Sequence, residues 1–269
     1  MIHEKIFLRE GEPDITLTTY VADERRIKRD AILVIPGGGY AQVCADREGE
    51  PIALAFMARG FNAFVLHYGV KEKALYPRPL ADASLAMQYI REHAEEFCID
   101  PDRVFAVGFS AGGHLCASLG SLWNAPELRA ALPDMPEGIN RPTGTILCYA
   151  VLSAHEVNTH NGTLHTAMGT QTPTQEQREI FSIDRRISAD TVPAFFMHTV
   201  ADQAVPVQNA LVTMKAMADH GISFDARIYP RGPHGMALAD RQTSFGNPPF
   251  EDGEIVRWVD DAVAWMKTV

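Results

Sequence analysis

Hydrophobic positions along this chain follow two spacings in turn, and the spacings predict alternating strands and helices. The short runs are either continuous and apolar or alternate with period two, and several end at glycine. Continuous apolar runs of roughly four to eight residues are typical of strands buried on both faces of a parallel sheet. The predicted strands are DITLTTYV (14–21), AILVIPGGG (31–39), GFNAFVLHY (60–68), RVFAVGF (103–109), TILCYAVL (145–152), PAFFMHTV (193–200) and FDARIYP (224–230).

Longer segments between these runs have apolar residues at helical spacing. The predicted helices are 79–97, 207–221 and 254–269. In the second, Leu211, Met214 and Met217 share a face, and Gly221 is a typical C-terminal signal. In the third, one face carries Ile255, Trp258, Val259, Ala262, Trp265 and Met266. These stripes are interpreted as core packing and not as ligand contacts.

Strand–helix alternation predicts an α/β protein with a mostly parallel central sheet and helices on both faces. A length of 269 residues fits a single domain, 1–269. Two segments, about 121–142 and 153–190, do not follow the alternation. Since long excursions in a compact domain are usually functional or mobile, we interpret them as short cap insertions or pocket walls.

Composition narrows the classes of partner and compartment. The chain is 46% hydrophobic and 22% charged, as in ordinary soluble proteins, and its net charge of −10 argues against nucleic-acid binding. No apolar stretch is long enough for a membrane span, and the N-terminal residues lack a signal-peptide core. Four cysteines without CxxC spacing are interpreted as reduced thiols, so a cytoplasmic location is expected. No metal-ligand spacing occurs, and neither a metal nor an organic cofactor is expected.

The sequence GFSAGG places Ser110 between Gly108 and Gly112, after a predicted buried strand and before an apolar segment. A GxSxG string is weak evidence by itself. In this context it matches a nucleophile elbow, where a strained strand-to-helix turn exposes the serine and glycines give the backbone room. The catalytic interpretation is therefore favoured over a tight turn with an incidental serine.

A serine hydroxyl needs a base to become a nucleophile, and the base needs an orienting acid. In folds with this elbow the chain order is serine, acid, histidine. Asp202 follows the strand 193–200, and His234 lies in a Gly/Pro-rich loop after the strand 224–230. Because all three residues follow strand ends, they can meet at one edge of the sheet.

Other residues compete for these roles. His198 lies inside a strand and is expected to be structural, whereas His114 follows the elbow too closely to act as its base. Asp225 opens a strand and does not end one, so Asp202 is preferred as the acid. A pocket role stays open for one of three histidines in the second excursion: His155, His160 and His165.

An oxyanion hole is also needed, because a tetrahedral intermediate carries negative charge on the carbonyl oxygen. The glycines of PGGGY, residues 37–39, let backbone N–H groups turn toward the site. The N–H of Ala111, directly after the nucleophile, is the second expected donor. One donor is worth roughly 3 to 4 kcal/mol of transition-state stabilisation. No GK[ST] follows the glycines, which excludes a P-loop.

In this order PGGGY, GFSAGGH, ADQAVP and GPHG resemble the α/β-hydrolase superfamily. They are more closely similar to its bacterial esterase branch, related to acetyl xylan esterases and hormone-sensitive-lipase-like esterases. The resemblance covers about residues 14–265 and implies an α/β-hydrolase fold. It also implies that Ser110 is the nucleophile, His234 the base and Asp202 the acid that orients the base. The oxyanion donors that it implies are the backbone N–H groups of Gly38, Gly39 and Ala111. Pro36 departs from many relatives, which have histidine there as an organiser of the glycine motif.

The activity implied by the resemblance is hydrolysis of short-chain acyl esters, acetyl in the first place, of carbohydrates such as acetylated xylan or xylo-oligosaccharides. The polar composition of segment 153–190 agrees with a hydrophilic small-molecule substrate. A lipase-like carboxylesterase, an amide hydrolase such as an arylformamidase, a peptidase, and a non-catalytic binding protein remain alternatives. The polar cap also leaves a homo-oligomeric contact open.

Overall fold

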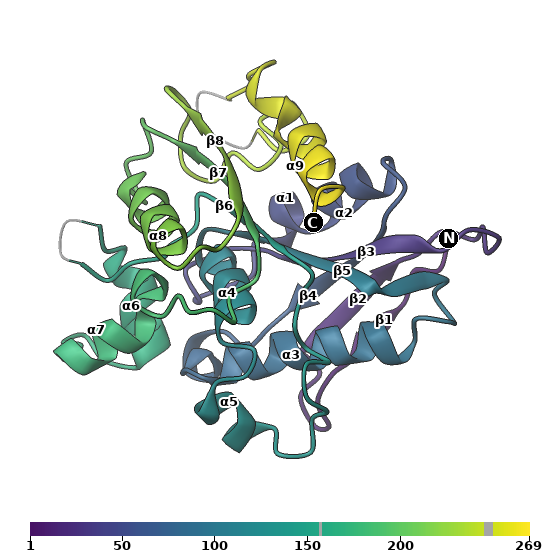
Figure 1. Ribbon diagram of the computed structural model, residues 1–269, viewed down its shortest axis with the longest axis horizontal. Helices are drawn as coiled ribbons and strands as arrows, with labels where there is room; N and C mark the ends of the chain where they lie inside the picture. Colours follow the sequence, from purple (N-terminus) through teal and green to yellow (C-terminus); the bar gives the residue numbers. More distant parts are fainter. Residues whose placement is uncertain (156–157, 245–249) are drawn as a thin grey trace.

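The computed structural model describes residues 1–155, 158–244 and 250–269, and an eight-stranded sheet runs through its centre (Figure 1). The strand order is β1-β2-β4-β3-β5-β6-β7-β8. β2 pairs antiparallel with β1 and β4, and the remaining neighbours are parallel. This sheet confirms the predicted fold class.

Seven of the strands were predicted from apolar runs or from period-two alternation, and one was not. The strands are β1 (Lys5–Phe7), β2 (Thr16–Tyr20), β3 (Arg29–Ile35), β4 (Asn62–His67), β5 (Ile99–Phe109), β6 (Thr145–Cys148), β7 (Ala194–Thr199) and β8 (Phe224–Tyr229). The unpredicted strand, β1, has three residues at the sheet edge, and its Phe7 is exposed. An exposed edge strand this short carries no hydrophobic periodicity.

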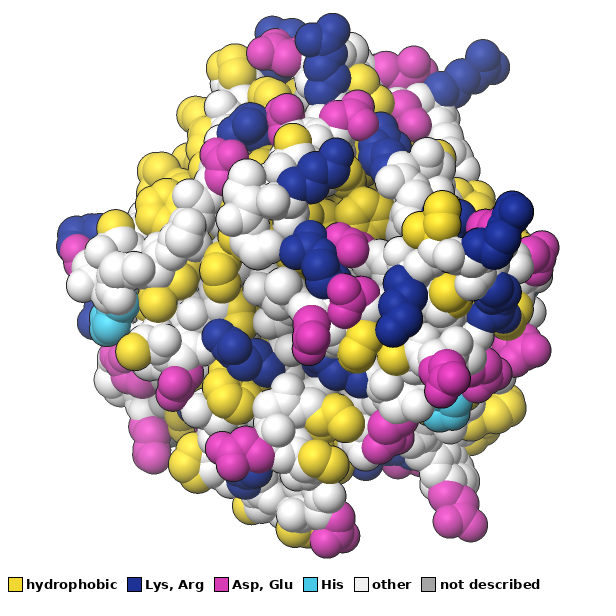
Figure 2. Space-filling view, turned by 45° about the vertical axis from the view of Figure 1, so that its right-hand side comes forward, with side chains coloured by type: hydrophobic (Ala, Val, Ile, Leu, Met, Phe, Trp, Pro, Cys, Tyr) yellow, Lys and Arg dark blue, Asp and Glu magenta, His cyan; other side chains and the backbone are white. Residues whose placement is uncertain are grey.

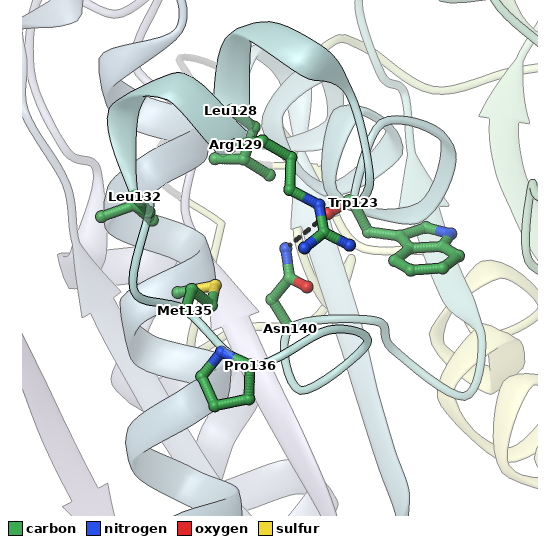
Figure 3. A pocket seen from close by; sticks show the side chains of 7 residues that line it. All are labelled: Trp123, Leu128, Arg129, Leu132, Met135, Pro136 and Asn140. Atoms are coloured by element: carbon green, nitrogen blue, oxygen red, sulfur yellow. Dashed lines mark hydrogen bonds between the residues drawn. The ribbon is translucent and has the colours of Figure 1, made fainter.

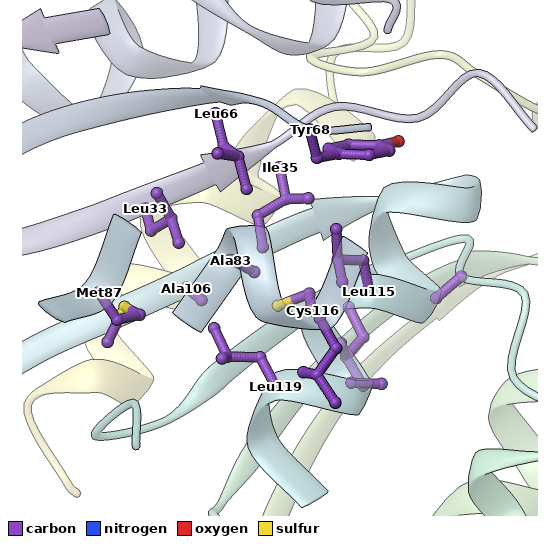
Figure 4. Packing of buried hydrophobic residues seen from close by; sticks show 14 of the residues in the cluster. Leu33, Ile35, Leu66, Tyr68, Ala83, Met87, Ala106, Leu115, Cys116 and Leu119 are labelled. Carbon is purple, nitrogen blue, oxygen red and sulfur yellow. The ribbon is translucent and has the colours of Figure 1, made fainter. Parts of the chain in front are cut away.

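Helices cover both faces of the sheet (Figure 1). On one face, α2 (Glu50–Met57) and α9 (Trp258–Met266) pack against the strands. On the other lie α3 (Arg78–Glu92), α4 (Ser110–Ser121) and α8 (Gln208–Asp219). Figure 4 shows part of this cluster, in which Leu33 and Leu66 of the sheet are joined by Met87 of α3 and Leu119 of α4. The predicted apolar face of the C-terminal helix is confirmed, since its residues are buried.

The face predicted for α8 is wrong at Leu211, while Met214 and Met217 pack against the core as predicted. Leu211 is 47% exposed, whereas Met217 is buried together with Asn209 and Thr213. The Asn209 side chain accepts hydrogen bonds from the N–H groups of Leu152 and Ser153, at 2.9 and 3.0 Å. A buried amide with these partners turns the helix so that Leu211 faces outward, which a reading of apolar spacing alone cannot foresee.

The two excursions form short helices. Segment 121–142 contains α5 (Pro126–Ala131) and begins where the 12-residue α4 ends, which is about 17 Å from Ser110 at 1.5 Å per residue. It folds around a small, mostly apolar cavity, across which the Asn140 side chain donates to the Trp123 carbonyl at 2.9 Å (Figure 3). Segment 153–190 contains α6 (Asn161–Met168), α7 (Gln175–Phe181) and η2 (Ile183–Arg185). η2 packs against α8 and α4.

The remaining short helices lie in connections: α1 (Ala45–Glu48) after β3, η1 (Lys71–Ala74) after β4, and η3 (Ile255–Arg257) before α9. On the face shown in Figure 2, side chains of both charges are interspersed among apolar and uncharged groups. Within residues 1–155, 158–244 and 250–269, no helix is long and apolar enough to cross a membrane.

Candidate active site

Ser110 stands on a strained turn between β5 and α4. Its φ of +53° lies in the left-handed region, which residues other than glycine rarely adopt. Glycine is needed at position 112, because a Cβ there would lie 2.2 Å from the Ile35 carbonyl oxygen and 2.3 Å from that of Pro36. The first turn of α4 therefore packs directly on the end of β3, as the nucleophile-elbow interpretation requires.

The structure brings the three predicted residues from separate loops into one chain of hydrogen bonds. His234 Nε2 lies 2.8 Å from Ser110 Oγ, and His234 Nδ1 lies 2.7 Å from Asp202 Oδ2. Because an ionised carboxylate only accepts, Nδ1 carries the proton and Nε2 is free to accept the serine proton. The tautomer is the one that a general base for Ser110 needs.

Asp202 is held as a carboxylate in a buried position. Its Oδ1 accepts the N–H groups of Ala204 and Val205, both at 2.9 Å. Burial alone would raise the pKa of Asp202, but the nearby His198 ring and the hydrogen bonds from His234 and the Val205 backbone outweigh it and hold the pKa well below its usual range. Asp202 therefore stays charged and can stabilise a protonated His234.

The competing residues have other partners. His198 is buried and bonds the Val205 carbonyl at 2.9 Å, with its Nε2 3.6 Å from Asp202 Oδ2, so it braces the acid loop. His114 contacts the Tyr40 hydroxyl and the Phe181 carbonyl. Asp225 pairs with Arg227 on β8. None of these three side chains therefore takes the place of the base or of the acid.

The glycine loop lies against the elbow. A Cβ at Gly37 would come within 2.9 Å of Ser110 Cβ. Gly38 and Gly39 have φ of +125° and +65°. Among the described residues, the N–H groups of Gly38, Gly39 and Ala111 donate to no protein acceptor. Such groups are suited to receive the oxygen of a tetrahedral intermediate.

A buried pair behind this loop was missed by the sequence analysis. Glu48 of α1 accepts the Gly37 N–H at 2.8 Å and the Tyr149 hydroxyl at 2.8 Å, and that hydroxyl accepts the Ala237 N–H at 3.0 Å. Burial raises the pKa of Glu48, against the hydrogen bonds from Gly37 and Tyr149 that lower it. The signal in the sequence was slight, since a glutamate in DREGEP resembles any surface residue.

One of the three cap histidines lies beside the site. His160 Nδ1 accepts the Thr163 hydroxyl at 2.8 Å at the start of α6, and Thr163 Oγ1 is 3.9 Å from where a Cβ of Gly39 would stand. Burial and the neighbouring His234 lower the pKa of His160. His155 bonds Arg185 instead. In the parts of the chain that the structure describes, no cluster of three His, Cys, Asp or Glu side chains is placed to hold a metal.

A serine elbow on a mostly parallel sheet, with a carboxylate and a histidine from the next strands, defines an α/β-hydrolase. The chain belongs to the BD-FAE family, whose profile matches residues 17–217. This match confirms the predicted membership of the α/β-hydrolase esterases. The protein is therefore a carboxylic ester hydrolase by family.

Individual relatives agree with this placement. The chain is 37% identical to endo-1,4-beta-xylanase B of Butyrivibrio fibrisolvens over 217 residues, which is 80% of this chain and 33% of that protein. It is 28% identical to an acetylxylan esterase of Xylanibacter ruminicola, over 77% of this chain and 41% of that protein. It therefore spans less than half the length of either.

A solved structure matches nearly end to end. It is that of an acetyl ester-xyloside bifunctional hydrolase from Caldicellulosiruptor lactoaceticus. The TM-score is 0.83 at 30% identity, and the match covers 98% of this chain and 96% of the other.

Proposed function

We propose that this protein is a serine esterase that hydrolyses short-chain acyl esters, foremost acetyl esters of carbohydrates such as acetylated xylo-oligosaccharides. The observation that carries the proposal is the unbroken hydrogen-bonded chain from Ser110 through His234 to Asp202, at 2.8 and 2.7 Å. These lengths are within the reach that proton transfer between a nucleophile and its base requires.

The reaction proceeds in two steps. Ser110 Oγ attacks the ester carbonyl while His234 Nε2 takes the hydroxyl proton, and Asp202 stabilises the imidazolium. The N–H groups of Gly38, Gly39 and Ala111 bind the oxyanion. When the C–O bond to the alcohol breaks, His234 gives its proton to the leaving oxygen. Water, deprotonated by His234, then attacks the acyl-enzyme, and the proton returns to Ser110 as the acid is released.

A groove with both apolar and polar lining is joined to the end of the glycine loop, and its polar side chains are available to a hydrophilic substrate. It has a volume of about 430 Å³ and lies between η1 and α6. Its polar side chains are those of Lys71, Glu72, His165, Thr166, Thr170 and Gln171. The Lys71 N–H donates to the Tyr40 carbonyl at 2.7 Å, and the Tyr76 N–H donates to that of Ala167 at 3.0 Å, so both walls are tied in place.

We propose that the chain acts as one domain in which segment 153–190 forms a wall of the substrate pocket. The names of an acetylxylan esterase and of an acetyl ester-xyloside hydrolase among its relatives support a sugar acetyl ester.

The experiment measures hydrolysis of p-nitrophenyl esters from acetyl to decanoyl, acetate release from acetylated xylo-oligosaccharides, and turnover of formyl-aryl amides and peptides. It compares the wild type with Ser110→Ala and with Ser118→Ala. Ser118 is a matched control because it is a buried serine of the same helix, whose hydroxyl bonds the His114 carbonyl. Ser110→Ala should reduce turnover on the order of a million-fold, whereas Ser118→Ala should keep it.

Acetate release from the sugar with short chains preferred supports the carbohydrate esterase. A preference for long chains would replace that substrate by a lipid-like ester. Turnover of formyl-aryl amides or peptides without ester turnover would assign the same residues to amide hydrolysis. Equal activity of Ser110→Ala and the wild type would contradict the assignment of Ser110 as the nucleophile.

A further inference from the structure

Glu48 is a carboxylate buried behind the glycine loop, 1% exposed. Each of its oxygens accepts a separate hydrogen bond: Oε2 from the Gly37 N–H and Oε1 from the Tyr149 hydroxyl. The phenol has one proton, and it also accepts the Ala237 N–H, so its proton points to Glu48. Both contacted oxygens therefore act as acceptors in these two hydrogen bonds.

The Pro36–Gly37 peptide unit is held by a hydrogen bond on each side. The Pro36 carbonyl accepts the Tyr68 hydroxyl at 2.8 Å, and the N–H of the same peptide, that of Gly37, donates to Glu48 at 2.8 Å. The next N–H along the chain belongs to Gly38. Orientation of the Pro36–Gly37 peptide therefore decides where the following donors point.

The same carboxylate reaches the loop that carries the base. Tyr149 connects Glu48 to the backbone of Ala237, three residues after His234, and its ring stands edge-on to the His234 ring at 5.0 Å between centroids. Ala237 and Tyr149 both have positive φ, of +48° and +36°. Strained backbone of this kind persists only where the surroundings hold it.

We propose that Glu48, acting through Tyr149, is a positioning residue that sets the glycine loop and the His234 loop relative to each other, so that donors and base meet the same tetrahedral intermediate. The inference rests on the proposed hydrolytic function. A buried carboxylate costs free energy unless its hydrogen bonds offset the lost solvation. Here those bonds go to the two loops that a transition state must engage together.

The chain contains a matched control. Tyr20 donates to Glu50 Oε2 at 3.0 Å, so this is a second Tyr–Glu pair, whose glutamate is exposed. Glu48→Gln keeps the volume of the side chain but replaces an acceptor oxygen by an N–H₂ group. Tyr149→Phe keeps the ring beside His234 and removes only the hydroxyl. Glu50→Gln and Tyr20→Phe make the same two changes outside the site.

The experiment uses the full chain and measures kcat and KM for p-nitrophenyl acetate, the inhibition constant of phenylboronic acid, and the melting temperature. A boronate forms a tetrahedral adduct on a reactive serine and places an oxygen where the oxyanion would be. For Glu48→Gln and Tyr149→Phe we expect kcat to fall about 10- to 100-fold with KM nearly constant, and boronate affinity to fall in step. The double variant should lose less than the product of the single losses. The two control variants should stay within about twofold.

Either of two results overturns the inference. The first is wild-type kcat and boronate affinity in a folded Glu48→Gln. The second is a loss of kcat with unchanged boronate affinity, which a merely structural role produces. If Glu48→Gln does not fold, Tyr149→Phe decides by the same criteria.

Labelling of Ser110 by a fluorophosphonate separates this inference from the proposed function, because it needs the base and the oxyanion donors but no natural substrate. A wild type that labels rapidly but cleaves no ester contradicts the ester assignment alone. Glu48→Gln labelling as fast as the wild type contradicts the positioning role alone.

Discussion

Asp202 keeps its charge because several donors converge on its two oxygens. The backbone N–H groups of Ala204 and Val205 donate to Oδ1, and His234 Nδ1 donates to Oδ2. His198 Nε2 lies 3.6 Å from the same Oδ2. At the scale of single residues, this convergence lets a buried carboxylate remain ionised and fix the His234 tautomer.

Asp202→Asn should therefore reduce kcat on p-nitrophenyl acetate by about 10⁴-fold, because an amide can present N–H to His234 and stabilise the wrong tautomer. Asp225→Asn is the matched control, since Asp225 pairs with Arg227 on β8 and does not contact His234. Kinetics of both variants test the assignment. A comparable loss in Asp225→Asn would reopen the choice of acid.

At the scale of elements, α8 shows how a buried polar side chain sets the rotation of a helix. Asn209 holds the backbone at Leu152 and Ser153, so Met217 faces the core and Leu211 faces solvent. We expect Met217→Ala to lower the free energy of unfolding by about 2 to 5 kcal/mol. Leu211→Ala should change it by about 0.5 kcal/mol or less. Urea unfolding distinguishes them, and equal losses would contradict the observed rotation.

The groove between η1 and α6 gives a prediction about substrate preference. Thr166 is half-buried on α6 and lines the groove, so Thr166→Trp should fill part of its 430 Å³. We expect the ratio of kcat/KM on acetylated xylo-oligosaccharide to that on p-nitrophenyl acetate to fall about tenfold. Glu176→Trp, at an exposed position on α7, is the control. An unchanged ratio in Thr166→Trp would place the sugar elsewhere.

At the scale of the whole molecule, His114 connects parts of the chain that surround the site. It lies on α4, and its ring bonds the Tyr40 hydroxyl after the glycine loop and the Phe181 carbonyl at the end of α7, at 2.8 and 2.9 Å. Because a carbonyl only accepts, Nε2 carries the proton and Nδ1 accepts from Tyr40. The neutral ring thus links the sheet edge to segment 153–190.

Burial lowers the pKa of His114 to about 4, from a usual value of about 6.5. The unfolded chain takes up this proton first as pH falls, so stability is full above about pH 6.5 and decreases toward pH 4. Between about pH 7 and pH 5 the wild type should lose about 2 kcal/mol more unfolding free energy than His114→Gln.

Urea unfolding at both pH values checks this expectation, with His220→Gln as the control because His220 is exposed. The control should retain the wild-type pH dependence. A wild type and a His114→Gln with the same pH dependence would show that His114 does not titrate in this range.

Much of the architecture was predictable because parallel strands buried on both faces must be continuous apolar runs. Six strands and the class of fold follow from that physical requirement, whereas the antiparallel β2 was predicted from period-two alternation and the apolar face of α9 from helical spacing. Ser110, Asp202 and His234 could be selected for a related reason. Parallel strands bring their carboxyl ends to one edge, so residues directly after strands can meet there.

Other features depend on partners far away in the sequence and were decided only by the tertiary structure. In the sequence Glu48 resembles a surface residue, but in the structure it is buried and accepts hydrogen bonds from Gly37 and Tyr149. Nothing in the sequence indicates that Asn209 is buried, where its side chain accepts the N–H of Leu152. The sequence by itself determined periodicity, strand ends and the types of side chain available for chemistry. Which polar groups are buried, which face of α8 is inside, and how two loops are held at a fixed spacing depend on long-range hydrogen bonds, because a buried polar group is stable only where the fold supplies its partner.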